Sequence, residues 1–204
     1  MSKVMKNVIM LGLLAGVLIG CGGDPQKKKA TAQPEKDGQQ ASAVDYRKEG
    51  MDYAMAVQGA LGKTLQGKIK ETGTAGAIEF CNVRALAITD SVARTLGASI
   101  SRITDQPRNP QNRANAEEMK FISNFRAELA AGQGPEPLIV RQDSLIYFYY
   151  PILTNNLCLQ CHGKRDSDIA PEVYQKLEIL YPEDKAVAYS ANQLRGLWKV
   201  AFNE

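Results

Sequence analysis

Apolar side chains recur at helical spacing from the point where the chain first becomes rich in large residues, near Asp45. The first run falls at Met51, Met55, Leu61, Leu65 and Ile69. A period of three to four residues is typical of a helix that packs one face against a core. Gly73 and Gly76 interrupt this run, so the first helix is expected to end there.

Three more helices are predicted further along. One covers about residues 77–96, and a second covers residues 115–130 before the glycines at 132 and 134. A short one covers residues 171–180. The apolar face of the first of these three consists of Ile78, Cys81, Ala85, Ile88 and Val92.

Alternating or aromatic-rich segments predict strands in the second half of the chain. These segments cover residues 99–104, 138–151, 186–189 and 197–202. The second is expected to be a hairpin with a four-residue turn at 141–144. Helices first and hairpin-connected strands afterwards predict an α+β domain with an antiparallel sheet over residues 45–204.

The N-terminal segment has the pattern of an export signal. Lys3 and Lys6 precede an apolar stretch at 8–19, which is too short for a comfortable membrane span and ends at Gly20-Cys21-Gly22-Gly23. This end resembles a bacterial lipoprotein signal, and the alternative is an ordinary secretory signal with a chance cysteine. The expectation is a signal peptide at 1–20, lipidation of Cys21, and a protein exported and anchored to a bacterial membrane, facing the periplasm or the cell exterior.

Residues 21–44 contain the lipidated cysteine and a segment rich in Lys, Gln, Pro, Glu, Asp, Gly and Ala. Such a composition predicts a disordered tether. Lys3 and Lys6 are two of 25 basic residues, so their removal leaves 23 basic against 22 acidic residues. This balance argues against a nucleic-acid partner bound through bulk charge.

The segment Cys158-Leu159-Gln160-Cys161-His162 matches the attachment pattern of c-type haem. Two thiols at this spacing can add to the two vinyl groups of one haem, and the adjacent histidine can then bind iron. The alternatives are a redox disulfide or half of a zinc site, but the sequence has no second Cys-x-x-Cys. One covalent haem c is therefore expected.

His162 is the sole histidine in the sequence, so one subunit cannot form a bis-histidine haem, and the sixth iron ligand must be Met, Cys, Lys, Tyr, a water or nothing. Cys81 is the cysteine left after lipid and haem are assigned, and it is either a distal haem ligand or a small apolar side chain in the core. Met51, Met55 and Met119 are competing candidates.

A group of polar residues between the predicted helices is suited to the anionic haem propionates. The group consists of Arg102, Arg108, Asn109 and Asn112. The alternative interpretation is that residues 108–110 only form a turn.

Several segments together resemble a bacterial family of single-haem c-type proteins of unknown function, whose best-known structural example is cyanobacterial. They are Ala77-Ile78-Glu79-Phe80-Cys81-Asn82, Arg102-Ile103-Thr104, Arg108-Asn109-Pro110 with Asn112, Cys158-Leu159-Gln160-Cys161-His162-Gly163, Tyr181-Pro182, Ala186, Tyr189 and Arg195-Gly196. The resemblance covers about residues 45–202. It implies a PAS-like fold and iron held between His162 and Cys81. The family often has Gly-Tyr and Gly-Asp steps before its last strand, where this chain has Ala188-Tyr189 and Asn192-Gln193.

A thiolate opposite histidine favours ferric iron and a low reduction potential, and its bond weakens on reduction. The sequence therefore predicts a redox or gas sensor that switches by exchange of the cysteine ligand and is read by an unidentified redox or signalling protein. The alternative is electron transfer by a tethered single-haem protein. A peroxidase-like enzyme is the least favoured class, because no second histidine is present to act as a distal base.

Overall fold

The computed structural model describes residues 44–142 and 144–203. The predicted signal peptide, the lipidation site at Cys21 and nearly all of the predicted tether lie outside the described residues, so these remain predictions. Within the described ranges, no helix is both long enough and apolar enough to cross a membrane.

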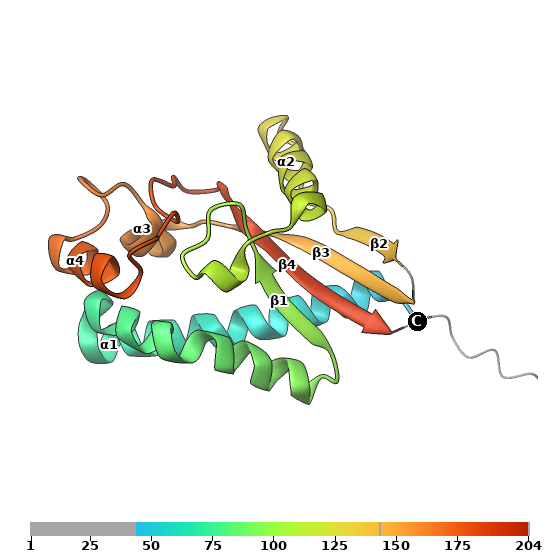
Figure 1. Ribbon diagram of the computed structural model, residues 1–204, viewed down its shortest axis with the longest axis horizontal. Coiled ribbons are helices and arrows are strands. Elements are labelled where there is room, and N and C mark those ends of the chain that lie inside the picture. Colours follow the sequence, from blue (N-terminus) through green and yellow to red (C-terminus); the bar gives the residue numbers. More distant parts are fainter. Residues whose placement is uncertain (1–43, 143, 204) are drawn as a thin grey trace, which may run out of the picture. The chain divides into compact units, whose positions relative to one another are not determined.

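The first helix, α1 (Tyr46–Thr95), consists of two helical halves that meet at Gly73. Gly73 has φ 71° and ψ 175°, a conformation that glycine adopts without a steric penalty. The chain doubles back there, as Figure 1 shows. The predicted break at Gly73 is confirmed, whereas Gly76 lies inside the second half. Asp45 begins the helix by accepting hydrogen bonds from the backbone N–H groups of Arg47 and Lys48, both at 3.1 Å.

Among the described residues, four antiparallel strands form one sheet in the order β1-β4-β3-β2. Their bounds are β1 (Ser99–Ile103), β2 (Leu138–Gln142), β3 (Leu145–Leu153) and β4 (Leu194–Asn203). The C-terminal strand β4 thus lies between β1 and β3. The prediction of an α+β domain with N-terminal helices and an antiparallel sheet is confirmed.

Two local strand predictions are wrong. Arg141 pairs with Ile146 inside the β2–β3 hairpin, so the turn is shorter than the four residues predicted. Residues 186–189 form no strand, because their backbone binds another segment instead. The N–H groups of Ala188 and Tyr189 donate to the carbonyls of Gly163 and His162, and Ala188 has φ 66°.

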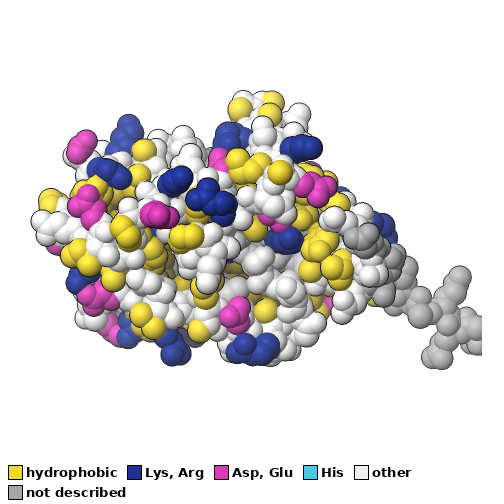
Figure 2. Space-filling model, in the orientation of Figure 1, with side chains coloured by type: hydrophobic (Ala, Val, Ile, Leu, Met, Phe, Trp, Pro, Cys, Tyr) yellow, Lys and Arg dark blue, Asp and Glu magenta, His cyan; other side chains and the backbone are white. Residues whose placement is uncertain are grey.

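The sheet is covered on both faces, because successive strand residues point to opposite sides. Phe148 and Val200 face α1, where a core cluster includes Ala54, Val57 and Ala93 from its two halves. Tyr149 and Leu197 face α2 (Ala116–Ala130) and pack with its buried residues Ile122 and Phe125. Figure 1 shows α1 and α2 on opposite sides of the sheet. In the view of Figure 2, acidic and basic side chains are interspersed over the surface.

Shorter elements complete the fold beside the second half of α1. They are the 3₁₀ helix η1 (Pro110–Asn112), α3 (Asn156–His162) and α4 (Pro171–Leu180). Leu177 and Val173 of α4 pack with Ile78 of α1. The predicted haem motif forms α3, and the Asn155 side chain caps its first turn by accepting from the Cys158 N–H at 3.2 Å.

Candidate haem site

A cavity of about 1060 Å³ lies between α1, the sheet and α3. A volume of this size is at the upper end for small-molecule and cofactor sites. All eight predicted cofactor-binding residues line it: Cys81, Arg102, Arg108, Asn109, Asn112, Cys158, Cys161 and His162. The fold therefore brings together side chains that are far apart in the sequence.

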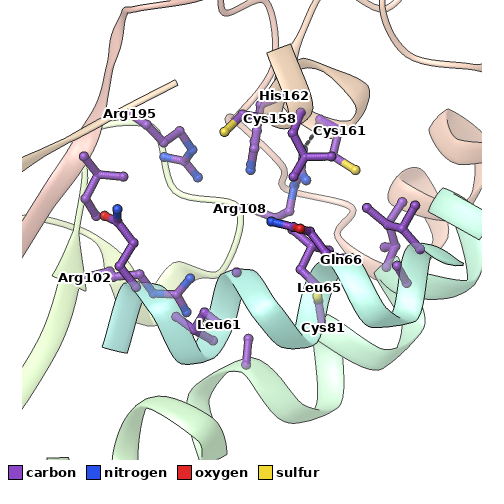
Figure 3. A pocket seen from close by; sticks show the side chains of 18 of the residues that line it. Leu61, Leu65, Gln66, Cys81, Arg102, Arg108, Cys158, Cys161, His162 and Arg195 are labelled. Atoms are coloured by element: carbon purple, nitrogen blue, oxygen red, sulfur yellow. Dashed lines mark hydrogen bonds between the residues drawn. The ribbon is translucent and has the colours of Figure 1, made fainter. Parts of the chain in front are cut away.

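The two long walls of the cavity come from different elements. Figure 3 shows Cys158, Cys161 and His162 of α3 on one side, and Leu61, Leu65 and Cys81 of α1 on the other. Both halves of α1 contribute apolar side chains to this wall. An apolar slot with a few polar groups is the usual lining of a cofactor site.

The first half of α1 also presents glycines to the cavity at Gly59, Gly62 and Gly67. A Cβ built at any of them would meet nothing within 4 Å. Glycine inside a helix costs about 1 kcal/mol relative to alanine, so three of them on one wall sacrifice helix stability and keep the wall flat. The space fits a broad, flat group such as haem.

His162 is held in a defined orientation at the end of α3. Its Nδ1 lies 2.7 Å from the Ala186 carbonyl oxygen, so Nδ1–H donates and Nε2 is left as the free ring nitrogen. Burial lowers the pKa of His162 well below its ordinary value, and the charges of Arg108, Arg195 and Arg102 lower it further. The ring is therefore neutral, which is the form that binds iron.

The two thiols of the motif differ in their surroundings. Burial raises the pKa of Cys161 to about 11, although Arg108 opposes this shift. The Cys158 Sγ lies 3.3 Å from the Asn155 Oδ1 at the start of the helix. Both cysteines are free thiols, as attachment to haem vinyl groups requires.

Cys81 is a partly buried free thiol in the second half of α1. Burial raises its pKa, whereas Arg102 and Arg108 act in the opposite direction and favour the thiolate. Among the competing ligands, Met55 lines the same cavity, but Met51 packs in the core cluster and Met119 is exposed on α2. Cys81 thus combines a cavity position with nearby positive charge.

The polar residues predicted to bind propionates fall into two groups. Arg108 already donates to Asp184, with Nε at 3.0 Å and Nη2 at 2.9 Å, and to the carbonyl of Cys161 at 2.5 Å. Asn109 Oδ1 caps η1 by accepting from the Gln111 N–H at 3.0 Å, which supports the turn interpretation for this segment. Asn112 lines the cavity, and its backbone carbonyl accepts from the Thr104 N–H at 2.8 Å.

Arg102 and Arg195 form the second group, and Arg195 was not among the predicted site residues. Arg195 donates from Nη1 to Thr104 Oγ1 at 3.0 Å and lies 5.5 Å over the ring of Tyr189. Figure 3 shows both arginines along the same wall. The sequence signal that could have identified Arg195 was a charged residue between Leu194 and Gly196 near the start of strand β4.

The charge of the cavity is uniformly positive. Its cationic lining residues are Lys63, Lys70, Arg102, Arg108 and Arg195, and among the described lining residues none is acidic. A cavity of this kind fits a cofactor that carries carboxylates. The thiols, the histidine, the flat wall and the arginines therefore all suit haem.

The fold and this site define the chain first as a PAS-like α+β domain. A family model described as Tll0287-like matches residues 26–203, and the chain belongs to that family. A similar solved structure is that of the cyanobacterial heme-protein Tll0287, with a TM-score of 0.58 and 17% sequence identity over 76% of this chain and 96% of that chain. No curated protein matches the chain. The resemblance predicted from the sequence is confirmed.

Proposed function

We propose that the chain binds one haem covalently, with Cys158 and Cys161 as the residues that would attach it and His162 and Cys81 as the residues that would hold its iron. The observation that carries this proposal is that these four side chains, from α3 and α1, line one cavity. Arg102 and Arg195 would pair with the propionates, since their wall is without carboxylates. The similar solved structure is that of a heme-protein, which gives further support.

The role we propose is that of a redox or gas sensor. When bound, the haem supplies a one-electron ferric–ferrous couple. Cys81 would hold the iron as a thiolate, and reduction by a partner would weaken this bond, so that Cys81 could take a proton from solvent and leave. Cys81 belongs to the second half of α1, which packs on α4. Its release would therefore change the constraints on both helices.

A second candidate function is electron transfer without a ligand change. It is favoured by the surface position of α3, where Asn156 and Gln160 are exposed next to the partly exposed Cys158. A haem attached there would lie close to a docking partner.

The deciding experiment uses the holoprotein made with a c-type haem attachment system. Ferric absorption and electron-paramagnetic resonance spectra are compared for the wild type, Cys81→Ser and the control Met55→Leu. We expect a low-spin thiolate spectrum that only Cys81→Ser abolishes. Carbon monoxide binding by the reduced wild type supports the sensor, whereas reversible reduction without a ligand change supports electron transfer. An unaltered Cys81→Ser spectrum refutes the ligand assignment.

We also propose that the protein is exported and held at a bacterial membrane by lipid on Cys21, with a separate protein as its redox or signalling partner. The leader sequence up to Gly20-Cys21 supports this. Metabolic labelling with a fatty acid tests it, because Cys21→Ser should abolish both the label and recovery in the membrane fraction. Retention of the label would rule out Cys21 as the acceptor.

A further inference from the structure

An ion pair between Arg108 and Asp184 lies beside the cavity, and these two residues are 76 positions apart in sequence. Their side chains are only 13% and 9% exposed, and their nitrogen and oxygen atoms approach to 2.9 Å. Removing two charges from water is unfavourable, and only good geometry and further hydrogen bonds offset this cost. The further side-chain hydrogen bonds of this pair go to the backbone of Cys161, which precedes His162, and of Ala186, whose carbonyl binds the His162 ring.

The first set of bonds fixes the two backbone segments next to the histidine. Arg108 Nη2 donates to the carbonyl of Cys161 at 2.5 Å and to the carbonyl of Ala186 at 3.2 Å. Asp184 Oδ1 accepts from the Ala186 N–H at 2.8 Å. The pair therefore holds Ala186 at both its N–H and its carbonyl.

The second link is the Ala186 carbonyl itself. It accepts from His162 Nδ1 at 2.7 Å and from Arg108 at the same time, and the side chain of Ala186 is fully buried. A carbonyl polarised by a guanidinium is a weaker acceptor for a second donor, so the imidazole keeps less anionic character. Hydrogen bonding to the outer nitrogen of a ligating histidine tunes the metal.

We propose that the Arg108–Asp184 pair is a positioning device for His162, which fixes its ring orientation and, through the Ala186 carbonyl, sets the reduction potential of the bound haem. This inference rests on the proposed function, because it requires His162 to be an iron ligand. Arg108 is thus a positioning residue, and Arg102 and Arg195 remain for the propionates.

The charge arm of the test measures the midpoint potential of Arg108→Gln and Asp184→Asn holoproteins by spectroelectrochemical titration. Arg108→Gln should lower the potential, because it removes a positive charge and strengthens the acceptor for His162. Asp184→Asn should raise it, because it leaves the Arg108 charge uncompensated. Shifts of the same sign in the two variants would overturn the proposal.

The positioning arm uses Arg108→Lys, which keeps the charge but cannot reach Asp184, Cys161 and Ala186 together. Its ferric electron-paramagnetic g values should change, with a smaller potential shift than in Arg108→Gln. A spectrum identical to wild type overturns the positioning role. This arm decides alone if the charge-removing variants do not fold.

The control is Arg126→Gln, which breaks another arginine–aspartate ion pair, with Asp105 at 2.8 Å, although the Arg126 side chain is 50% exposed. It should leave both the potential and the g values unchanged, and an equal effect would overturn the specific role of the Arg108 pair. Failure of the proposed function is distinguishable, because the wild type itself would then lack a low-spin thiolate spectrum.

Discussion

The guanidinium groups of Arg102 on β1 and Arg195 on β4 lie along one wall of the cavity, and the charge of Arg195 adds to the effect of burial in lowering the pKa of Arg102. The backbone of Arg102 belongs to the β1–β4 ladder, but no hydrogen bond or ion pair joins the side chain of Arg102 to any of the described residues. Two cations in such a position are a source of repulsion until an anion lies between them. The wall is therefore suited to the bound state and unfavourable in the haem-free state.

Arg102→Gln should have opposite effects on the two states. In the haem-free chain it removes a partly buried charge without a partner, so the free energy of unfolding should rise by about 1 kcal/mol. In the holoprotein it removes a propionate partner, so the free energy of unfolding should fall by a similar amount. Urea unfolding of both forms measures this, and an effect of the same sign in both would contradict the assignment of Arg102.

Alanine substitutions at two glycines of α1, Gly50 and Gly62, distinguish space filled by the protein core from space available to the cofactor. A Cβ at Gly50 would clash with the Phe148 ring, so Gly50→Ala should destabilise the chain by about 1–3 kcal/mol with or without haem.

Gly62 is the matched position, because a Cβ there meets nothing within 4 Å. Gly62→Ala should stabilise the haem-free chain by about 1 kcal/mol through helix propensity. The gain should disappear in the holoprotein, where the methyl group occupies cofactor space. Chemical denaturation of the wild type and Gly62→Ala, each with and without haem, checks this. An equal gain in stability in the two forms would place the cofactor elsewhere.

Thiol reactivity of the haem-free chain should depend on pH in a residue-specific way. Because burial raises the pKa of Cys161 to about 11, little thiolate is present near neutral pH, and reactivity should keep increasing as the pH rises toward that value. At pH 8 a pKa raised from 9.0 to about 11 lowers the thiolate fraction about 100-fold relative to the unfolded chain. Pulsed alkylation with mass spectrometry, with and without urea, measures the ratio. Equal rates would show that Cys161 is not buried.

Carbon monoxide kinetics should separate the departure of Cys81 from ligand binding itself. In the reduced wild type the weakened Cys81 bond must still break before carbon monoxide binds, so the observed rate should reach a plateau at high carbon monoxide. In Cys81→Ala the rate should increase linearly with concentration. Stopped-flow mixing measures both, and a linear dependence in the wild type would argue against Cys81 as a ligand of the reduced iron.

Local pattern predicted the elements better than it predicted their pairing. The helical runs, the break at Gly73 and the 138–151 hairpin follow from side-chain periodicity and glycine placement. The position of β4 between β1 and β3 depends on contacts between segments far apart in the chain, for which the sequence has no local signal. Residues 186–189 were predicted as a strand from their sequence. Ala186 and Tyr189 are indeed buried, but they pack around His162 and do not pair with a strand.

The part of the site that could be predicted is the part that belongs to a recognisable sequence motif. The Cys-x-x-Cys-His spacing and the count of remaining cysteines pointed to residues that line one cavity. The use of Arg108 could not be predicted, because its partner Asp184 is 76 positions away and only the fold brings them together. Arg195 was missed for the related reason that Arg102, which lines the same cavity, is distant in sequence.

Cys81 and His162 lie in helices that are far apart in the sequence, and an iron atom bound to both would be a crosslink. A crosslink that closes a loop of roughly 80 residues stabilises a folded chain by about 4.5 kcal/mol in the chain-entropy model. Loss of the Cys81 bond would open that loop without cutting the covalent haem attachment. Reduction would then loosen α1 against the rest of the domain, and a partner could detect this change as mechanical compliance, without contacting the haem.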